Sequence, residues 1–117
     1  MEIGETLVVS NWQEWREWLA QHHHDRKEIW LIYYKKSSGK VGISYEEAVE
    51  EALCFGWIDG AIKGINEATY AGRFTPRRPK SPWSASNRER VARLIREGRM
   101  TEAGMGVLPA DLNSYES

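Results

Sequence analysis

The chain has 117 residues, of which 41% are hydrophobic and 28% charged, and its net charge is −1. This length and composition predict one globular domain with a single core. No apolar run approaches the roughly 20 residues that cross a bilayer, so we expect no membrane insertion. Cys54 is the single cysteine, and the N-terminus lacks the pattern of a secretory signal. We therefore expect a cytoplasmic location.

The charges are unevenly distributed along the chain. Residues 1–59 carry six basic and eleven acidic side chains, whereas residues 60–100 carry ten basic and three acidic ones, a net charge of +7. A basic segment within a nearly neutral protein indicates a local anionic partner rather than general adhesion to nucleic acid.

The first predicted elements are a helix and a strand. Ser10 can cap a helix over residues 11–24, in which tryptophan and leucine side chains recur on one face at helical spacing. The segment EIWLIYYKK, residues 28–36, is rich in β-branched and aromatic side chains. This composition predicts a strand that is covered on both faces.

A second helix is predicted from its capping signals. Ser44 and Glu47 form a capping box, which opens a helix that extends to about Phe55. Gly56 occupies the position of a left-handed C-cap. Glutamates cluster toward the N-terminal half of this helix, where the helix dipole favours acidic side chains.

The segments 57–64 and 69–75, WIDGAIKG and TYAGRFT, predict a β-hairpin. When their apolar residues are matched across the pair, Asp59 lies opposite Arg73. We favour an ion pair for this carboxylate. The alternative is that Asp59, in its aromatic setting, acts as a general base.

The stretch FTPRRPKSPWSASNRER, residues 74–90, combines three prolines with five basic side chains. Its prolines keep the chain extended, and Ser84 or Ser86 then caps a helix that ends at Gly98. The unsatisfied N–H groups at the start of this helix attract anions, and Trp83 offers a flat apolar wall. In the alternative interpretation Trp83 is part of the core, the serines are caps, and the arginines pair with glutamates of the second helix.

The helix that follows carries an apolar stripe of Val91, Leu94 and Ile95, with charged side chains on the opposite face. We interpret that face as solvated and held by pairs such as Arg93–Glu97. Arg88 differs, because it lies in the first turn, where the dipole disfavours a cation. Thr101 is predicted to cap a short final turn.

Two further groups favour structural roles. The adjacent histidines at residues 22–24 point in different directions on a helix and cannot all reach one ion, so we expect no metal. Cys54 lies near the end of an apolar helix and is predicted to be a core residue.

Four blocks between residues 44 and 104 carry a resemblance to a known family. These blocks are A-L-C-F-G-W-I-D-G, F-T-P-R, S-x-W-S-x-x-N and L-I-x-x-G-R-M-T-x-x-G. They resemble the bacterial bacteriocin-protection family, also called YdeI/OmpD-associated. The resemblance implies protection against bacteriocins or cationic antimicrobial peptides, and a porin as partner. It implies no catalytic residue. The matching positions are Trp57, Asp59, Gly60, Pro76, Arg77, Ser81, Trp83, Ser84, Asn87, Gly98, Arg99 and Met100.

We expect a single α+β domain over residues 1–117, with helices packed on a small, mainly antiparallel sheet. The tail from about residue 108 is predicted to be frayed. The first functional hypothesis is a non-enzymatic binding domain of this stress-protection family, without a cofactor. Its partner would be a small anion or the acidic surface of a protein. Because such a site is basic, protection against cationic peptides would be indirect.

Two other functions stay open. One is an enzyme that acts on a phosphorylated or carboxylated metabolite, with Asp59 as base and arginines as an anion clamp. The other is a nucleic-acid binder that uses residues 73–99, which the local charge pattern makes the weaker alternative. The predicted ligand-binding residues are Trp57, Asp59, Arg73, Arg77, Arg78, Trp83, Ser84, Asn87 and Arg88.

Overall fold

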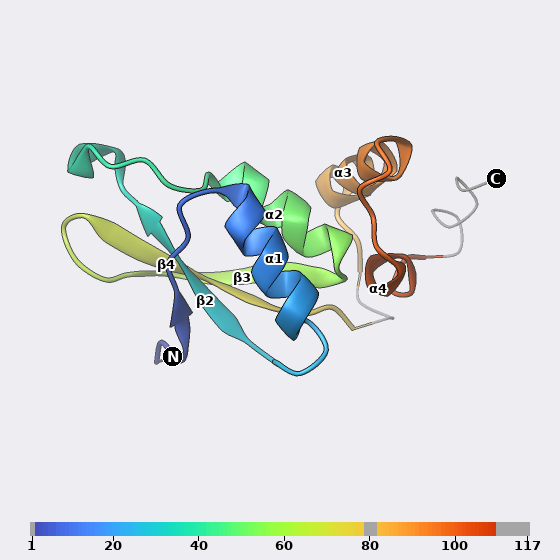
Figure 1. The fold of residues 1–117 in the computed structure, drawn as a ribbon, viewed down its shortest axis with the longest axis horizontal. Helices are drawn as coiled ribbons and strands as arrows, with labels where there is room; N and C mark the ends of the chain where they lie inside the picture. The colour runs from blue at the N-terminus through green and yellow to red at the C-terminus, as the bar shows by residue number, and fades with distance from the viewer. Residues whose placement is uncertain (1, 79–81, 110–117) are drawn as a thin grey trace.

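The computed structural model describes residues 2–78 and 82–109 and has an α+β fold, as predicted (Figure 1). Helices pack on one four-stranded sheet. Within the described residues, no helix is both long and apolar enough to cross a membrane. The elements in chain order are β1 (Thr6–Leu7), α1 (Trp12–His22), β2 (Ile29–Tyr34), η1 (Lys36–Ser38), α2 (Tyr45–Cys54), β3 (Trp57–Gly64), β4 (Thr69–Pro76), α3 (Ala85–Arg96) and α4 (Glu102–Met105).

The sheet has the strand order β1-β2-β4-β3, and α1 and α2 lie across one of its faces (Figure 1). β1 pairs with β2 in parallel, whereas β2 with β4 and β4 with β3 are antiparallel pairs. The mainly antiparallel sheet is therefore confirmed. β1 was not predicted, because two residues are too few to show the alternation typical of a strand.

The hairpin of β3 and β4 is confirmed, but its predicted register is wrong. Asp59 lies opposite Phe74 rather than Arg73, and the register shifts again between Asp59 and Ile62. Such an irregularity adds a residue to one strand, which matching of apolar positions does not detect. The predicted Asp59–Arg73 ion pair is therefore absent from the described structure, and Arg73 contacts Glu28 instead.

Most helix ends follow their capping signals. Ser44 and Glu47 form the capping box of α2, and Ser84 caps α3. Gly56 and Gly98 follow α2 and α3 with left-handed φ angles of 77° and 70°. Glycine adopts this conformation without the steric cost that a Cβ atom imposes.

The first helix begins at a different cap from the one predicted. The side chain of Asn11, rather than that of Ser10, accepts a hydrogen bond from the backbone of Glu14, at 2.9 Å. Ser10 contributes its backbone N–H, which donates to the Glu14 carboxylate at 2.7 Å. The two bonds satisfy two backbone N–H groups at the start of α1.

Tryptophans from a helix and a strand lie at the centre of the core. Trp15 and Trp57 are no more than 1% exposed. The indole N–H of Trp15 donates to the carbonyl of Ala48 at 3.0 Å, and that of Trp57 donates to His23 at 3.3 Å. These bonds join α1 to α2 and to β3, so the buried indoles are not left unsatisfied.

The end of α2 provides the docking point for α4. The hydroxyl and backbone N–H of Thr101 donate to the carbonyl of Cys54 at 2.6 Å and 3.0 Å. Gly104 is buried there, and a Cβ atom on it would lie 2.7 Å from the carbonyl carbon of Cys54. Leu108, which was predicted to begin the frayed tail, is buried, while residues 110–117 of that tail lie outside the described residues.

Gly104→Ala is expected to lower the free energy of unfolding by about 2 kcal/mol, because the new methyl group must displace backbone at the end of α2. Gly64→Ala is the matched control, since a Cβ atom on Gly64 meets nothing within 4 Å. Urea unfolding of both variants measures the difference. Equal stability of the two variants would contradict the tight docking of α4.

Candidate functional site

The predicted site residues lie in several separate environments. Trp57 belongs to the core, and Arg73 pairs with Glu28 on the sheet. Ser84 accepts a hydrogen bond from the backbone of Asn87 as the cap of α3. The described part of the chain forms four surface hollows whose lining residues are known. None of the nine predicted ligand-binding residues lines any of these four. The structure therefore does not gather the nine residues around one of these hollows.

Arg77 and Trp83 form one packed unit at the start of the crossing from β4 to α3. The Arg77 guanidinium lies 3.8 Å from the centroid of the Trp83 ring and donates to the carbonyl of Pro82. The backbone N–H of Arg77 donates to Gly56 at 2.7 Å. Arg77 is only 7% exposed, and its burial lowers the pKa of the guanidinium. These contacts give Arg77 a structural role that anchors the crossing on the core.

The other cations of this region differ in exposure. Arg78 is exposed, whereas Arg88 is half-buried and interacts with other residues. Asn87 accepts a hydrogen bond from Arg90 at 2.9 Å. Lys80 and its neighbour Ser81, which the sequence placed in the same loop, lie outside the described residues.

A network of arginines and glutamates joins α2 to α3. Arg90 makes a two-bond contact with the carboxylate of Glu46, at 2.8 Å and 2.9 Å. Arg93 contacts Glu50 at 2.6 Å and also reaches Glu97 at 3.3 Å. The predicted Arg93–Glu97 pair is confirmed, but the interpretation of this face as merely solvated was incomplete. The alternative interpretation, in which arginines of residues 74–90 pair with glutamates of the second helix, is confirmed for Arg90.

Glu51 is the buried member of this network. It is 0% exposed and accepts from Arg16 at 2.8 Å and from Arg99. Burial alone would lower the pKa of the Arg99 guanidinium, but its hydrogen bonds and charge interactions with Glu51 and Glu97 together outweigh this effect, and the pKa is raised. The guanidinium of Arg16 also donates to the backbone carbonyl of Arg99 at 3.0 Å. A buried carboxylate is tolerated here because two cations surround it.

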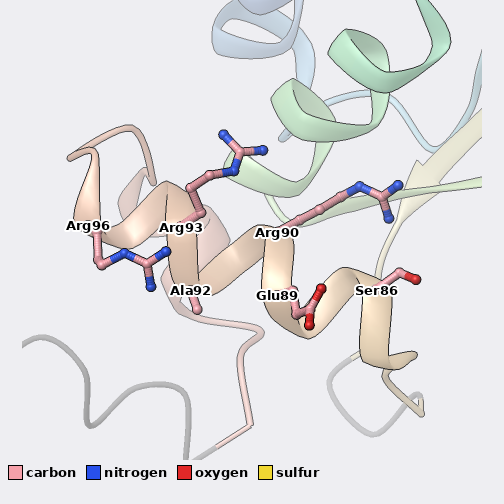
Figure 2. A pocket seen from close by; sticks show the side chains of 6 residues that line it. All are labelled: Ser86, Glu89, Arg90, Ala92, Arg93 and Arg96. Carbon is pink, nitrogen blue, oxygen red and sulfur yellow. The ribbon is translucent and has the colours of Figure 1, made fainter.

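One surface hollow of about 570 Å³ runs along α3 (Figure 2). Arg90 and Arg93 extend from the helix toward α2 at its edge, while Arg96 lies at the end of α3 (Figure 2). Three arginines and one glutamate line the hollow, so its formal charge is positive. Its lining residues are Ser86, Glu89, Arg90, Ala92, Arg93 and Arg96.

A second cluster combines Asp59 with three tyrosines on the helix-covered side of the sheet. The Tyr45 hydroxyl donates to the carboxylate of Asp59. The Tyr33 ring stacks on Tyr70, with centroids 5.1 Å apart, and lies 5.9 Å from the ring of Tyr45. Tyr33 is 2% exposed, and among the described residues its hydroxyl has no hydrogen-bond partner. The cluster thus contains an acceptor, aromatic faces and a buried polar atom with unused capacity.

Tyr33 and Tyr45 stay protonated well above neutral pH. Burial and the hydrogen bond to Asp59 raise the pKa of Tyr45 to about 12. Burial, with nearby Tyr45, Tyr70 and Asp59, also raises the pKa of Tyr33. Both hydroxyls therefore act as neutral donors and acceptors.

Cys54 is fully buried, which confirms its predicted place in the core. Burial raises the pKa of its thiol to about 11, so the thiolate needed for nucleophilic chemistry is scarce at neutral pH. Within residues 2–78 and 82–109, no group of three histidine, cysteine or acidic residues is arranged to hold a metal ion.

Glu51→Gln is expected to lower the free energy of unfolding by about 3 kcal/mol, because it removes the carboxylate that pairs with Arg16 and the buried one of the three that contact Arg99. Glu46→Gln, which removes the charge of a more exposed carboxylate, is expected to cost under about 1 kcal/mol. Urea unfolding at low salt compares them. A Glu51→Gln cost no larger than that of Glu46→Gln would show that the buried carboxylate does not organise the helices.

Tyr33→Phe is expected to leave the free energy of unfolding unchanged or to raise it by about 1 kcal/mol, because it removes a buried hydroxyl that lacks a partner. Tyr45→Phe removes a hydroxyl that donates to Asp59, so it is expected to lower stability by about 1 kcal/mol. Thermal unfolding gives both values. A clear loss of stability in Tyr33→Phe would mean that its hydroxyl is satisfied in the folded protein.

The chain was compared with known proteins and families. No curated protein and no solved structure is significantly similar to it. The family described as Domain of unknown function (DUF8412) matches residues 7–107, which extend from the end of β1 to beyond α4 and include the arginine–glutamate network and the tyrosine cluster. This match extends over more than half of the chain, and the protein therefore belongs to the DUF8412 family.

Proposed function

We propose that this protein is a non-enzymatic binding domain whose α3 surface binds an acidic segment of a partner protein. The observation that carries the proposal is the positive hollow along α3, which is lined by Arg90, Arg93 and Arg96 against a single carboxylate, that of Glu89. Complementary charge of this kind accelerates and orients association.

The shape of the hollow favours a protein segment over a small anion. Its six lining residues all belong to one helix, so they form a surface along α3 and do not surround a ligand (Figure 2). Sites for small molecules are usually concave and enclose most of the ligand. An extended acidic chain can instead lie along the helix and contact successive turns.

The cations of the hollow contribute in two ways. Arg90 and Arg93 are held in place by Glu46 and Glu50, which reduces the side-chain entropy lost when a partner binds. Arg96 is exposed, and among the described residues it has no ion-pair partner. Arg96 is therefore the side chain with the most hydrogen-bonding capacity left for a carboxylate.

The biological role that we propose is bacterial stress protection, by the resemblance of this chain to the bacteriocin-protection family. An acidic partner suits an indirect role, because a positive surface repels cationic peptides. A porin remains a partner proposal by the same resemblance. The proposed enzyme with Asp59 as base has less support, since Tyr45 already donates to that carboxylate.

Arg96→Glu is expected to weaken binding of a fluorescent hexaglutamate peptide about tenfold, because it replaces an attraction with a repulsion worth about 1.4 kcal/mol. Lys27→Glu is the matched control, since it makes the same charge change at an exposed position between α1 and β2. Fluorescence anisotropy at two salt concentrations measures both affinities.

Three other results would contradict the proposal that α3 binds an acidic protein segment. Equal weakening by Lys27→Glu would mean that only net charge matters and that α3 holds no site. Tighter binding of an oligothymidine, with affinity that falls steeply as salt increases, would favour the nucleic-acid alternative. Tighter binding of inorganic phosphate than of the peptide would favour a small-anion site.

A further inference from the structure

We propose that Asp59, Tyr33, Tyr45 and Tyr70 form a binding site for an alkylammonium group, such as a lysine side chain or a free aliphatic amine. This site is separate from the α3 surface and has the opposite charge. It therefore does not rest on the function proposed for α3.

The strand register brings these residues to one face of the sheet. Tyr33 lies opposite Tyr70 in the β2–β4 pair, and Asp59 lies opposite Phe74 in the β3–β4 pair. Leu31 and Phe74 belong to the core on this face, so the face is the one packed against helices. α2 begins at Tyr45, which therefore forms the edge of the cluster where helical cover starts.

Close packing of the tyrosines depends on a glycine in β4. A Cβ atom on Gly72 would lie 2.8 Å from the ring of Tyr33 and 3.2 Å from the side chain of Ile62. The absence of a side chain at Gly72 lets the Tyr33 ring lie against the strand. Ile62 is 52% exposed and Tyr45 is 38% exposed, so this end of the sheet face is open to solvent.

The groups present match the needs of an ammonium ion. An ammonium group donates three hydrogen bonds and accepts none, and it is attracted to the faces of aromatic rings. The Asp59 carboxylate supplies the counter-charge, and its Oδ2 atom is held by the Tyr45 hydroxyl. The Tyr33 hydroxyl oxygen is a second acceptor, and it has no partner among the described residues.

The surrounding charges favour a cation over an anion. Arg90 of α3 interacts electrostatically with Asp59, but its two-bond contact is with Glu46, so the guanidinium does not bind the Asp59 carboxylate. Among the described residues, no cation forms an ion pair with Asp59, whose carboxylate supplies the negative charge of the cluster. An anion placed here would meet this carboxylate and the negative faces of the tyrosine rings.

The proposal is tested by titrating the ¹⁵N-labelled protein with n-butylammonium chloride and with Nα-acetyl-lysine N-methylamide, each against n-butanol as the uncharged control. We expect saturable shifts of amides in β3 and the first turn of α2 with both cations and none with n-butanol. Saturation by the lysine derivative alone points to a protein lysine as the ligand, and saturation by both points to any alkylammonium. Saturation by neither cation would overturn the proposal.

Single substitutions distinguish an ammonium-binding site from a cluster that only stabilises the fold. Asp59→Asn is expected to weaken butylammonium binding at least tenfold, and Tyr33→Phe at least threefold without loss of stability. Glu28→Gln, which alters a carboxylate paired with Arg73 on the sheet, is expected to leave binding unchanged. Equal effects of Asp59→Asn and Glu28→Gln would show only general charge attraction and would overturn the site. Hexaglutamate binding by Asp59→Asn reports independently on the α3 surface.

Discussion

The structure depends on the burial of one carboxylate between two cations. Glu51 has no exposed surface, and it is contacted by Arg16 from α1 and by Arg99, which follows α3. An unpaired buried carboxylate would cost several kcal/mol, whereas a paired one constrains the elements that carry its partners. The contact therefore ties α1 and the segment that follows α3 to a single position on α2.

This constraint also decides which cations can serve a ligand. Glutamates of α2 form ion pairs with Arg90, Arg93 and Arg99. Several of the positive charges of residues 60–100 are therefore paired within the protein. Arg77 is likewise committed to its stack on Trp83 and to the carbonyl of Pro82. Exposed positive charge remains at Arg78, before α3, and at Arg96, at the end of α3.

The two candidate surfaces follow from different parts of the architecture. The α3 surface is a single exposed helix face, which suits an extended polymer with opposite charge. The Asp59 cluster instead lies where the helical cover of the sheet begins at Tyr45, and it combines a carboxylate with aromatic faces. A domain with surfaces of opposite charge is suited to contact two different partners.

The sequence alone determined the local structure well. The capping box of Ser44 and Glu47, the left-handed Gly56 and Gly98, the hairpin strands and the buried Cys54 were all predictable, because each depends on neighbouring residues or on a repeating apolar pattern. The sequence also indicated the α+β class and the basic segment. It did not predict β1, whose two residues depend on pairing with β2.

Only the tertiary structure decided which charges meet. The strand register, with its irregularity between Asp59 and Ile62, places Asp59 opposite Phe74 and not opposite its predicted partner Arg73. Arg73 instead forms an ion pair with Glu28, which is far from it in the sequence. Tyr33, Tyr45 and Tyr70 come from three different elements, so no spacing in the chain could reveal that they adjoin Asp59. Charges and polar groups act over a few ångströms in space, and distances of that kind are set by packing and strand register, not by separation along the chain.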